Sequence, residues 1–112
     1  MNHSRWKTAR TRALLGEPAP EAPAVTAARQ EIRYALALGQ AVYDRRTALG
    51  ISQTEVARRA GMTQPQISRI EGGDTVPTLP LLERLAGALE SELDIHLVPG
   101  SEAEVRFHSP AA

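Results

Sequence analysis

Apolar residues recur every three to four positions from Val25 to about Ala48, and charged residues occupy the other faces. The pattern predicts one long helix of about 35 Å, at about 1.5 Å per residue, that ends at Gly50. Three compact helices are expected after it, because three start signals follow. These signals are capping boxes at residues 52–55 and 63–66 and Thr78 followed by Pro80, and the last helix is expected to bury Leu82, Leu85, Ala86 and Leu89.

After the last helical segment, the apolar spacing changes to strict alternation. Leu93, Ile95 and Leu97 alternate with other residues, which predicts a half-buried strand. A turn at Pro99-Gly100 follows, and the stretch around Phe107 predicts a second, weaker strand that also includes Val105. A lone hairpin is marginal in water, so we expect it to lean on the helices or to pair with another chain.

These patterns predict an all-α fold with an extended first helix and a short C-terminal strand or hairpin. Three regions are expected: residues 1–24 form a flexible basic arm and a proline-rich linker, residues 25–90 form the helical domain, and residues 91–112 form the strand and tail. The arm can form a short helix over residues 4–15, and we expect this segment, which carries Trp6, to fold on binding a partner.

Residues 51–71 carry the most informative motif. Ala57 is small where two short helices must cross, Gly61 suits a left-handed turn, and Ile67 faces inward. These three constraints are independent, and together they indicate a helix-turn-helix. The inward-facing residues are expected to be Val56, Ala60, Met62, Ile67 and Ile70, which leaves the start and outer face of the second helix free to enter a DNA groove.

Residues 38–90 resemble the helix-turn-helix domain of lambdoid phage repressors, Cro proteins and xenobiotic-response-element regulators. The resemblance implies a lambda-repressor-like fold, double-stranded DNA as the partner, and a buried ion pair between Arg46 and Glu71 that ties the first helix to the recognition helix. It also implies that Gln53 lies against the DNA backbone and supports Gln64. The candidate DNA-binding residues are Gln53, Thr63, Gln64, Pro65, Gln66, Ser68 and Arg69.

The chemistry of these positions agrees with DNA recognition. The amide of Gln64 can donate to and accept from an adenine edge, and Arg69 can bind guanine or a phosphate. Arg58 and Arg59 fit a solvated helix face equally well. Residues 72–76 contain no Lys or Arg, so one domain is expected to bind weakly, and a dimer on two half-sites about 34 Å apart is expected.

The whole chain is similar to HigA-like antitoxins of type II toxin–antitoxin operons. This resemblance implies a dimer that represses its own operon and neutralises a RelE/HigB-like mRNA interferase, with Trp6, Ile32 and Leu36 as candidate partner-binding residues. One alternative is a stand-alone xenobiotic-response-element-type regulator without a toxin. Another is a protein-interaction module whose helix-turn-helix no longer reads DNA.

Composition narrows the remaining classes. The net charge of the 112 residues is zero, but residues 1–12 hold four basic and no acidic side chains, so DNA binding requires a local patch. The chain has no cysteine, which excludes thiol catalysis, disulfides and cysteine-based zinc sites. The three histidines lack metal-ligand spacing, and Asp94 with His96 fits a solvated strand face better than a catalytic dyad.

We therefore expect neither an enzyme nor a cofactor or metal. No apolar run approaches the roughly 18 residues of a membrane span, and the apolar stretch after the basic start is too short for a signal peptide. A cytoplasmic location is expected.

Overall fold

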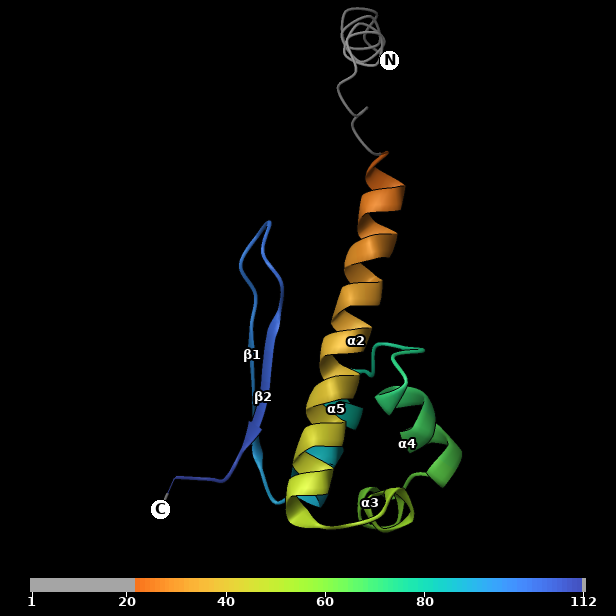
Figure 1. The fold of residues 1–112 in the computed structure, drawn as a ribbon, viewed down its shortest axis with the longest axis vertical. Helices are drawn as coiled ribbons and strands as arrows, with labels where there is room; N and C mark the ends of the chain where they lie inside the picture. The colour runs from red at the N-terminus through yellow and green to blue at the C-terminus, as the bar shows by residue number, and fades with distance from the viewer. Residues whose placement is uncertain (1–21, 112) are drawn as a thin grey trace, which may run out of the picture.

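The computed structural model describes residues 22–111. Within them, four helices are followed by a hairpin of two antiparallel strands (Figure 1). In chain order, the elements are α2 (Pro23–Leu49), α3 (Gln53–Ala60), α4 (Gln64–Glu71), α5 (Leu79–Ala88), β1 (Glu92–His96) and β2 (Glu104–His108). The helical fold with a C-terminal hairpin that the sequence predicts is confirmed. The predicted arm helix and Trp6 lie outside the described residues.

Helix α2 contains 27 residues and spans about 40 Å. It begins at Pro23, two residues before the helix start expected at Val25. A proline fits the first helical turn, because its missing N–H group would have no partner there and its φ is already helical. The helix ends as predicted at Gly50, which has a left-handed φ of 69° and donates its N–H to the Thr47 carbonyl.

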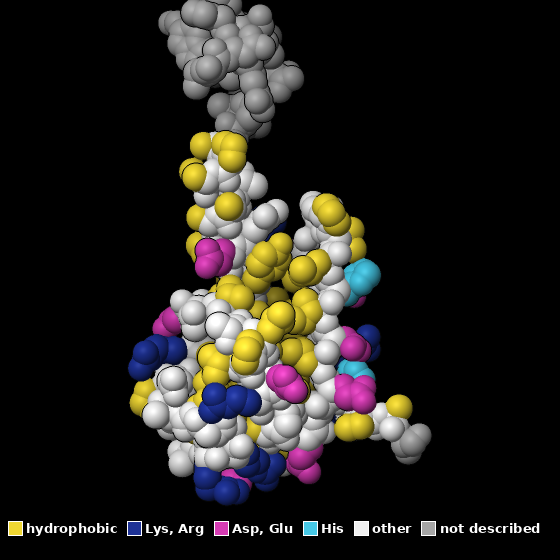
Figure 2. Space-filling view, turned by 180° about the vertical axis from the view of Figure 1, so that it is seen from behind, with side chains coloured by type: hydrophobic (Ala, Val, Ile, Leu, Met, Phe, Trp, Pro, Cys, Tyr) yellow, Lys and Arg dark blue, Asp and Glu magenta, His cyan; other side chains and the backbone are white. Residues whose placement is uncertain are grey.

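The N-terminal half of α2 projects beyond the other three helices (Figure 1). At about 100° of turn per residue, Val25, Ile32 and Leu36 fall on one face of the helix. Their exposed fractions are 46%, 58% and 54%. Hydrophobic side chains are visible along this projecting end and between it and the hairpin (Figure 2). The structure therefore leaves an apolar stripe without cover from the described residues.

The two predicted capping boxes differ in the structure. At α4, the box is complete: the Thr63 hydroxyl accepts from the Gln66 N–H, and the Gln66 side chain accepts from the Thr63 N–H. At α3, the Ser52 hydroxyl accepts from the Glu55 N–H, but the Glu55 carboxylate binds two arginines rather than the Ser52 N–H. The reciprocal half of that box was predicted wrongly, because both carboxylate oxygens of Glu55 are bound by guanidinium groups, which carry a full positive charge.

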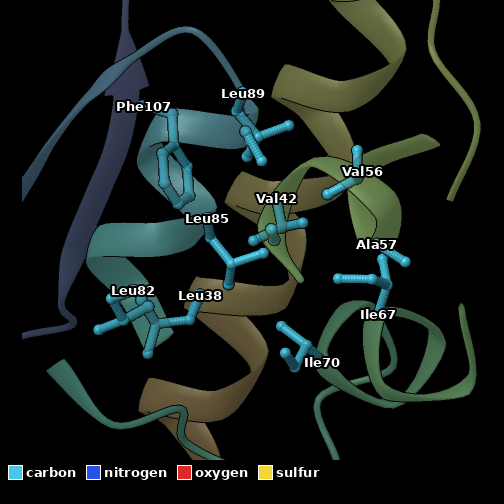
Figure 3. Close-up of a cluster of buried hydrophobic side chains, with 12 residues drawn as sticks. Leu38, Val42, Val56, Ala57, Ile67, Ile70, Leu82, Leu85, Leu89 and Phe107 are labelled. Atoms are coloured by element: carbon cyan, nitrogen blue, oxygen red, sulfur yellow. The ribbon is translucent and has the colours of Figure 1, made fainter. Parts of the chain in front are cut away.

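A single buried cluster joins the four helices and β2 (Figure 3). Its fully buried side chains come from every helix: Val42, Val56, Ile67, Leu85 and Leu89. Phe107 closes the cluster from β2 and is 8% exposed. The predicted inward-facing residues of the helix-turn-helix are confirmed, with Met62 half-buried against the cluster. In α5, Ala88 is buried, whereas Ala86, predicted to be buried, is only half-buried.

Helices α2 and α4 make backbone contact at Gly39. A Cβ atom there would clash with the Ile70 carbonyl oxygen and would lie 2.8 Å from that of Glu71. Glycine is the one residue type without this atom, so the close approach of α4 to α2 depends on it.

The hairpin packs beside α2 and against α5 (Figure 1). Leu93 pairs with Phe107 and Ile95 with Val105, which places these four apolar side chains on one face. The opposite face of the hairpin carries three cross-strand pairs, each of an acidic and a basic residue: Glu92–His108, Asp94–Arg106 and His96–Glu104. The predicted half-burial of the first strand holds only at Leu93, because Ile95 and Leu97 are 39% and 58% exposed where the hairpin extends beyond α5.

Arg45 of α2 fastens the start of the hairpin. Its Nε donates to the Leu89 carbonyl (3.1 Å) and to the Ser91 hydroxyl (2.6 Å). One terminal nitrogen of the same guanidinium donates to the Glu90 carbonyl and to the Ser109 hydroxyl. One side chain thereby joins both ends of the hairpin to α2.

Replacing Gly39 by Ala should lower the free energy of unfolding by about 1–3 kcal/mol, because the added methyl group must push α4 away from α2. Urea denaturation measures the change. Gly87→Ala in α5 is the matched control, because a Cβ atom at this position meets nothing within 4 Å. This substitution should raise the free energy of unfolding by up to about 1 kcal/mol, since alanine favours the helix more than glycine does. Equal effects of the two substitutions would contradict the close contact.

Candidate nucleic-acid interface

The corner between α3 and α4 turns at Gly61, as predicted. Its φ is 65°, in the left-handed region, and the next N–H, of Met62, donates to the Ala57 carbonyl. Arg84 of α5 holds the corner from the other side, donating to the carbonyls of Ala60 (2.8 Å) and Gly61 (2.6 Å). Sequence reasoning missed Arg84, because no local pattern links it to a turn more than twenty residues away.

Arg46 and Glu71 form a two-pronged ion pair between α2 and the end of α4. Nε lies 2.7 Å from Oε2, and a terminal nitrogen lies 2.9 Å from Oε1. The third nitrogen donates to the Ile51 carbonyl. The side chains are only 14% and 6% exposed, and the hydrogen bond to Glu71 raises the pKa of Arg46. The pair fixes the C-terminal end of α4 on α2.

A chain of hydrogen bonds runs from this ion pair to the start of α4. Gln53 Nε2 donates to Glu71 Oε1 (3.2 Å), and Gln64 Nε2 donates to Gln53 Oε1 (2.8 Å). A carboxylate only accepts, so Gln53 must turn its NH2 group toward Glu71 and its oxygen toward Gln64. Gln64 in turn keeps its amide oxygen and one N–H available. We call this chain, from Arg46 through Glu71 and Gln53 to Gln64, the amide relay.

The outer face of α4 carries the other candidate residues. Gln64, Pro65, Ser68 and Arg69 are exposed, while Ile67 and Ile70 point into the core. Within the described residues, the side chains of Ser68 and Arg69 make no hydrogen bond or ion pair, so both are available to a ligand. Thr63 and Gln66 are exposed too, but their side-chain oxygens take part in the cap of α4.

Arg58 and Arg59 of α3 are both engaged with Glu55. Arg58 contacts both carboxylate oxygens, the shorter contact being 2.6 Å, and Arg59 lies 2.9 Å from Oε1. These hydrogen bonds, from Arg58 first and then Arg59, lower the pKa of Glu55 to about 2. Arg59 also reaches Glu90 and the Ala88 carbonyl. Their contacts favour a structural, solvated face over direct DNA contact.

The histidines that the structure describes do not form a metal site. His108 Nε2 lies 2.7 Å from Asp94, so Asp94 contacts the opposite strand rather than His96. Hydrogen bonds with the Ser109 carbonyl and then with Asp94 raise the pKa of His108. Among residues 22–111, no group of three or more His, Cys, Asp or Glu side chains is placed to hold a metal ion.

Comparison with known proteins decides the family. Residues 42–95 match the helix-turn-helix family model. An uncharacterised HTH-type transcriptional regulator of Haemophilus influenzae is 38% identical over 66 residues, which cover 59% of this chain and 67% of the relative. The chain belongs to the helix-turn-helix family. It is a DNA-binding transcriptional regulator of the Cro/C1 type.

One solved structure is similar to this helix-turn-helix regulator. The crystal structure of the restriction-modification controller protein C.AhdI from Aeromonas hydrophila is 31% identical, with a TM-score of 0.51. The match covers 52% of the regulator and 88% of C.AhdI. The family match begins at Val42, about three-quarters of the way along α2, so the projecting N-terminal end of this helix lies outside it. None of the described helices is long and apolar enough to cross a bilayer.

Replacing Arg46 by Met should lower the free energy of unfolding by about 3 kcal/mol or more, because the buried Glu71 carboxylate loses its cation. The double substitution Arg46→Met with Glu71→Leu removes both charges and should recover most of that loss. Urea denaturation of the three proteins measures both effects. An Arg46→Met protein as stable as the parent would show that the pair is not buried in solution.

Proposed function

We propose that this regulator is an antitoxin that represses its own operon as a homodimer and neutralises a RelE/HigB-like mRNA interferase. The observation that carries the proposal is the projecting end of α2. It lies outside the family match and exposes an apolar stripe that a minimal DNA-binding domain does not need. The similarity to HigA-like antitoxins supplies the identity of the partner.

In this proposal, Gln64 is the residue that reads a base. It is exposed at the N-terminus of α4, and the amide relay leaves it one acceptor and one donor. That pair of groups matches N6 and N7 of adenine in the major groove. Arg69 lies five residues after Gln64 in α4 and contacts guanine or a phosphate in this proposal. The N-terminal N–H groups of α3 and α4 contact phosphates.

Two features support binding as a dimer. The reading face of one chain, which we define as Gln64, Pro65, Ser68 and Arg69 on the outside of α4, is small. Residues 72–76 contain no Lys or Arg that could contact the DNA backbone. A second copy on the next half-site, about 34 Å away, doubles the contacts and matches the two-fold symmetry of operators.

The toxin-binding surface in this proposal is the apolar stripe. Ile32 is its most exposed member, at 58%. Leu36 lies against Gly73, so part of its side chain already has a neighbour. Trp6, the third candidate residue for partner binding, lies outside the residues that the structure describes.

The second candidate is a stand-alone transcriptional regulator. The relative from Haemophilus influenzae is described as an HTH-type transcriptional regulator, and C.AhdI is named a restriction-modification controller protein. The neighbouring gene separates the two candidates: an adjacent frame for a small basic protein of the mRNA-interferase type favours the antitoxin, and its absence favours the regulator.

Replacing Gln64 by Ala should weaken binding to the native promoter by about 1–3 kcal/mol and relax the preference at one base pair. Mobility shift on the promoter and on single-base variants measures both. Glu83→Ala, an exposed change on α5, is the control and should bind like the parent. Unchanged affinity of the Gln64 variant would remove Gln64 from the set of base-contacting residues.

Replacing Ile32 by Asp should abolish neutralisation of the co-expressed toxin and leave promoter binding intact, because the change places a charge on the apolar stripe. Growth rescue and mobility shift give the two readouts. Leu79→Asp, at an apolar residue 76% exposed at the start of α5, is the matched control. Full rescue by the Ile32 variant would move the toxin contact away from this stripe.

A further inference from the structure

A groove runs between α2 and the hairpin. Three hollows of about 470, 320 and 310 Å³ follow one another along it. The first two share Ala37, Gln40 and Ala103, and the last two share Arg33 and Glu102. The hollow near the tip of the hairpin is visible in Figure 2, with hydrophobic side chains around it. We call this continuous feature the α2–hairpin groove.

The groove combines apolar walls with an excess of carboxylates. Leu97 and Val98 of the hairpin, 58% and 44% exposed, face the hollow that Tyr34 lines from α2. Four carboxylates and two guanidinium groups line its length, namely Asp44, Asp94, Glu102, Glu104, Arg33 and Arg106. Within the described residues, Glu102 and Glu104 have no cationic partner. A ligand that is both basic and apolar fits this surface.

We propose that residues 1–21 of the same chain occupy the α2–hairpin groove. This segment has the complementary composition: Trp6 and the pair Leu14-Leu15 are apolar. Its basic residues are Arg5, Lys7, Arg10 and Arg12, and no acidic residue lies among the first twelve. Opposite charge attracts the segment to the groove, and burial of Trp6 supplies the apolar part of the binding energy.

The length of the segment suits this placement. The groove begins at Gln30, about 10 Å along α2 from Pro23, and continues to Asp44 over about 21 Å. Residues 16–21 reach about 20 Å when extended, which is enough to turn back to the start of the groove. The helix predicted over residues 4–15 is about 18 Å long and matches the remaining length.

The covalent connection favours the same chain over other occupants. A short tether gives an effective concentration of about millimolar, so weak complementarity suffices for binding. The hairpin and α4 lie on opposite sides of α2 (Figure 1), so an arm in the groove leaves the reading face of α4 accessible. Binding of the arm is therefore separable from DNA binding, and it does not require a toxin.

Trp6 is the single tryptophan of the chain and reports on the arm directly. In the full-length protein at low salt, Trp6 should be protected from acrylamide quenching relative to the urea-unfolded chain. Glu102→Lys should lower the ratio of bound to free arm about fivefold, because it replaces an attraction by a repulsion. Glu83→Lys on α5, outside the groove, is the matched control and should quench like the parent. Added salt should release the arm in the parent protein.

Leu97→Asp tests the apolar part of the groove and should also expose Trp6, with circular dichroism confirming that the helices remain. Protection that disappears on dilution would mean that the arm binds a second copy, which overturns the proposal. Quenching as strong as in the unfolded chain, or protection that Glu102→Lys and Leu97→Asp leave unchanged, overturns it as well. Mobility shift on the same variants keeps this outcome separate from the proposed DNA binding.

Discussion

The ion pair between Arg46 and Glu71 is the constraint on which the outer face of α4 depends. A buried ion pair adds little net stability over a well-packed apolar pair, because both ions must leave water. Its value here is directional: Glu71 accepts hydrogen bonds and never donates them, so it sets the orientation of Gln53 and, through it, that of Gln64. One half-buried carboxylate thereby constrains which atoms a surface amide presents to a ligand.

The backbone contact at Gly39 complements this polar arrangement. Gly39 sets how closely α4 approaches α2, while Arg84 and the left-handed Gly61 set the angle of the corner. Helix α4 is therefore positioned by the ion pair, by the backbone contact at Gly39 and by the corner that Gly61 and Arg84 form. Side chains on its outer face can vary without loss of this frame, which is how one fold serves many operators.

Signals that act over a few residues were predictable from the sequence, and interactions over long separations were not. Gly50, Gly61 and the cap at Thr63 follow from local backbone chemistry. Arg45 and Arg84 act on carbonyls twenty to forty-five residues away, and nothing in the spacing marks them. The Glu55 carboxylate could accept from the Ser52 N–H or from nearby arginines, and in the structure it binds Arg58 and Arg59. The exposure of Ile95 depends on where α5 stops, which alternation along a strand cannot reveal.

The charged face of the hairpin has a consequence for how the protein behaves at high concentration. Two paired strands leave two outer edges, and neither is paired within the residues that the structure describes. Free edges recruit strands of other molecules into growing sheets. The face of the hairpin that carries Glu92, Asp94 and Arg106 is charged, and charged side chains along an edge disfavour the addition of further strands. These side chains thus disfavour edge-to-edge pairing of the hairpin with other molecules, which matters for a chain of zero net charge.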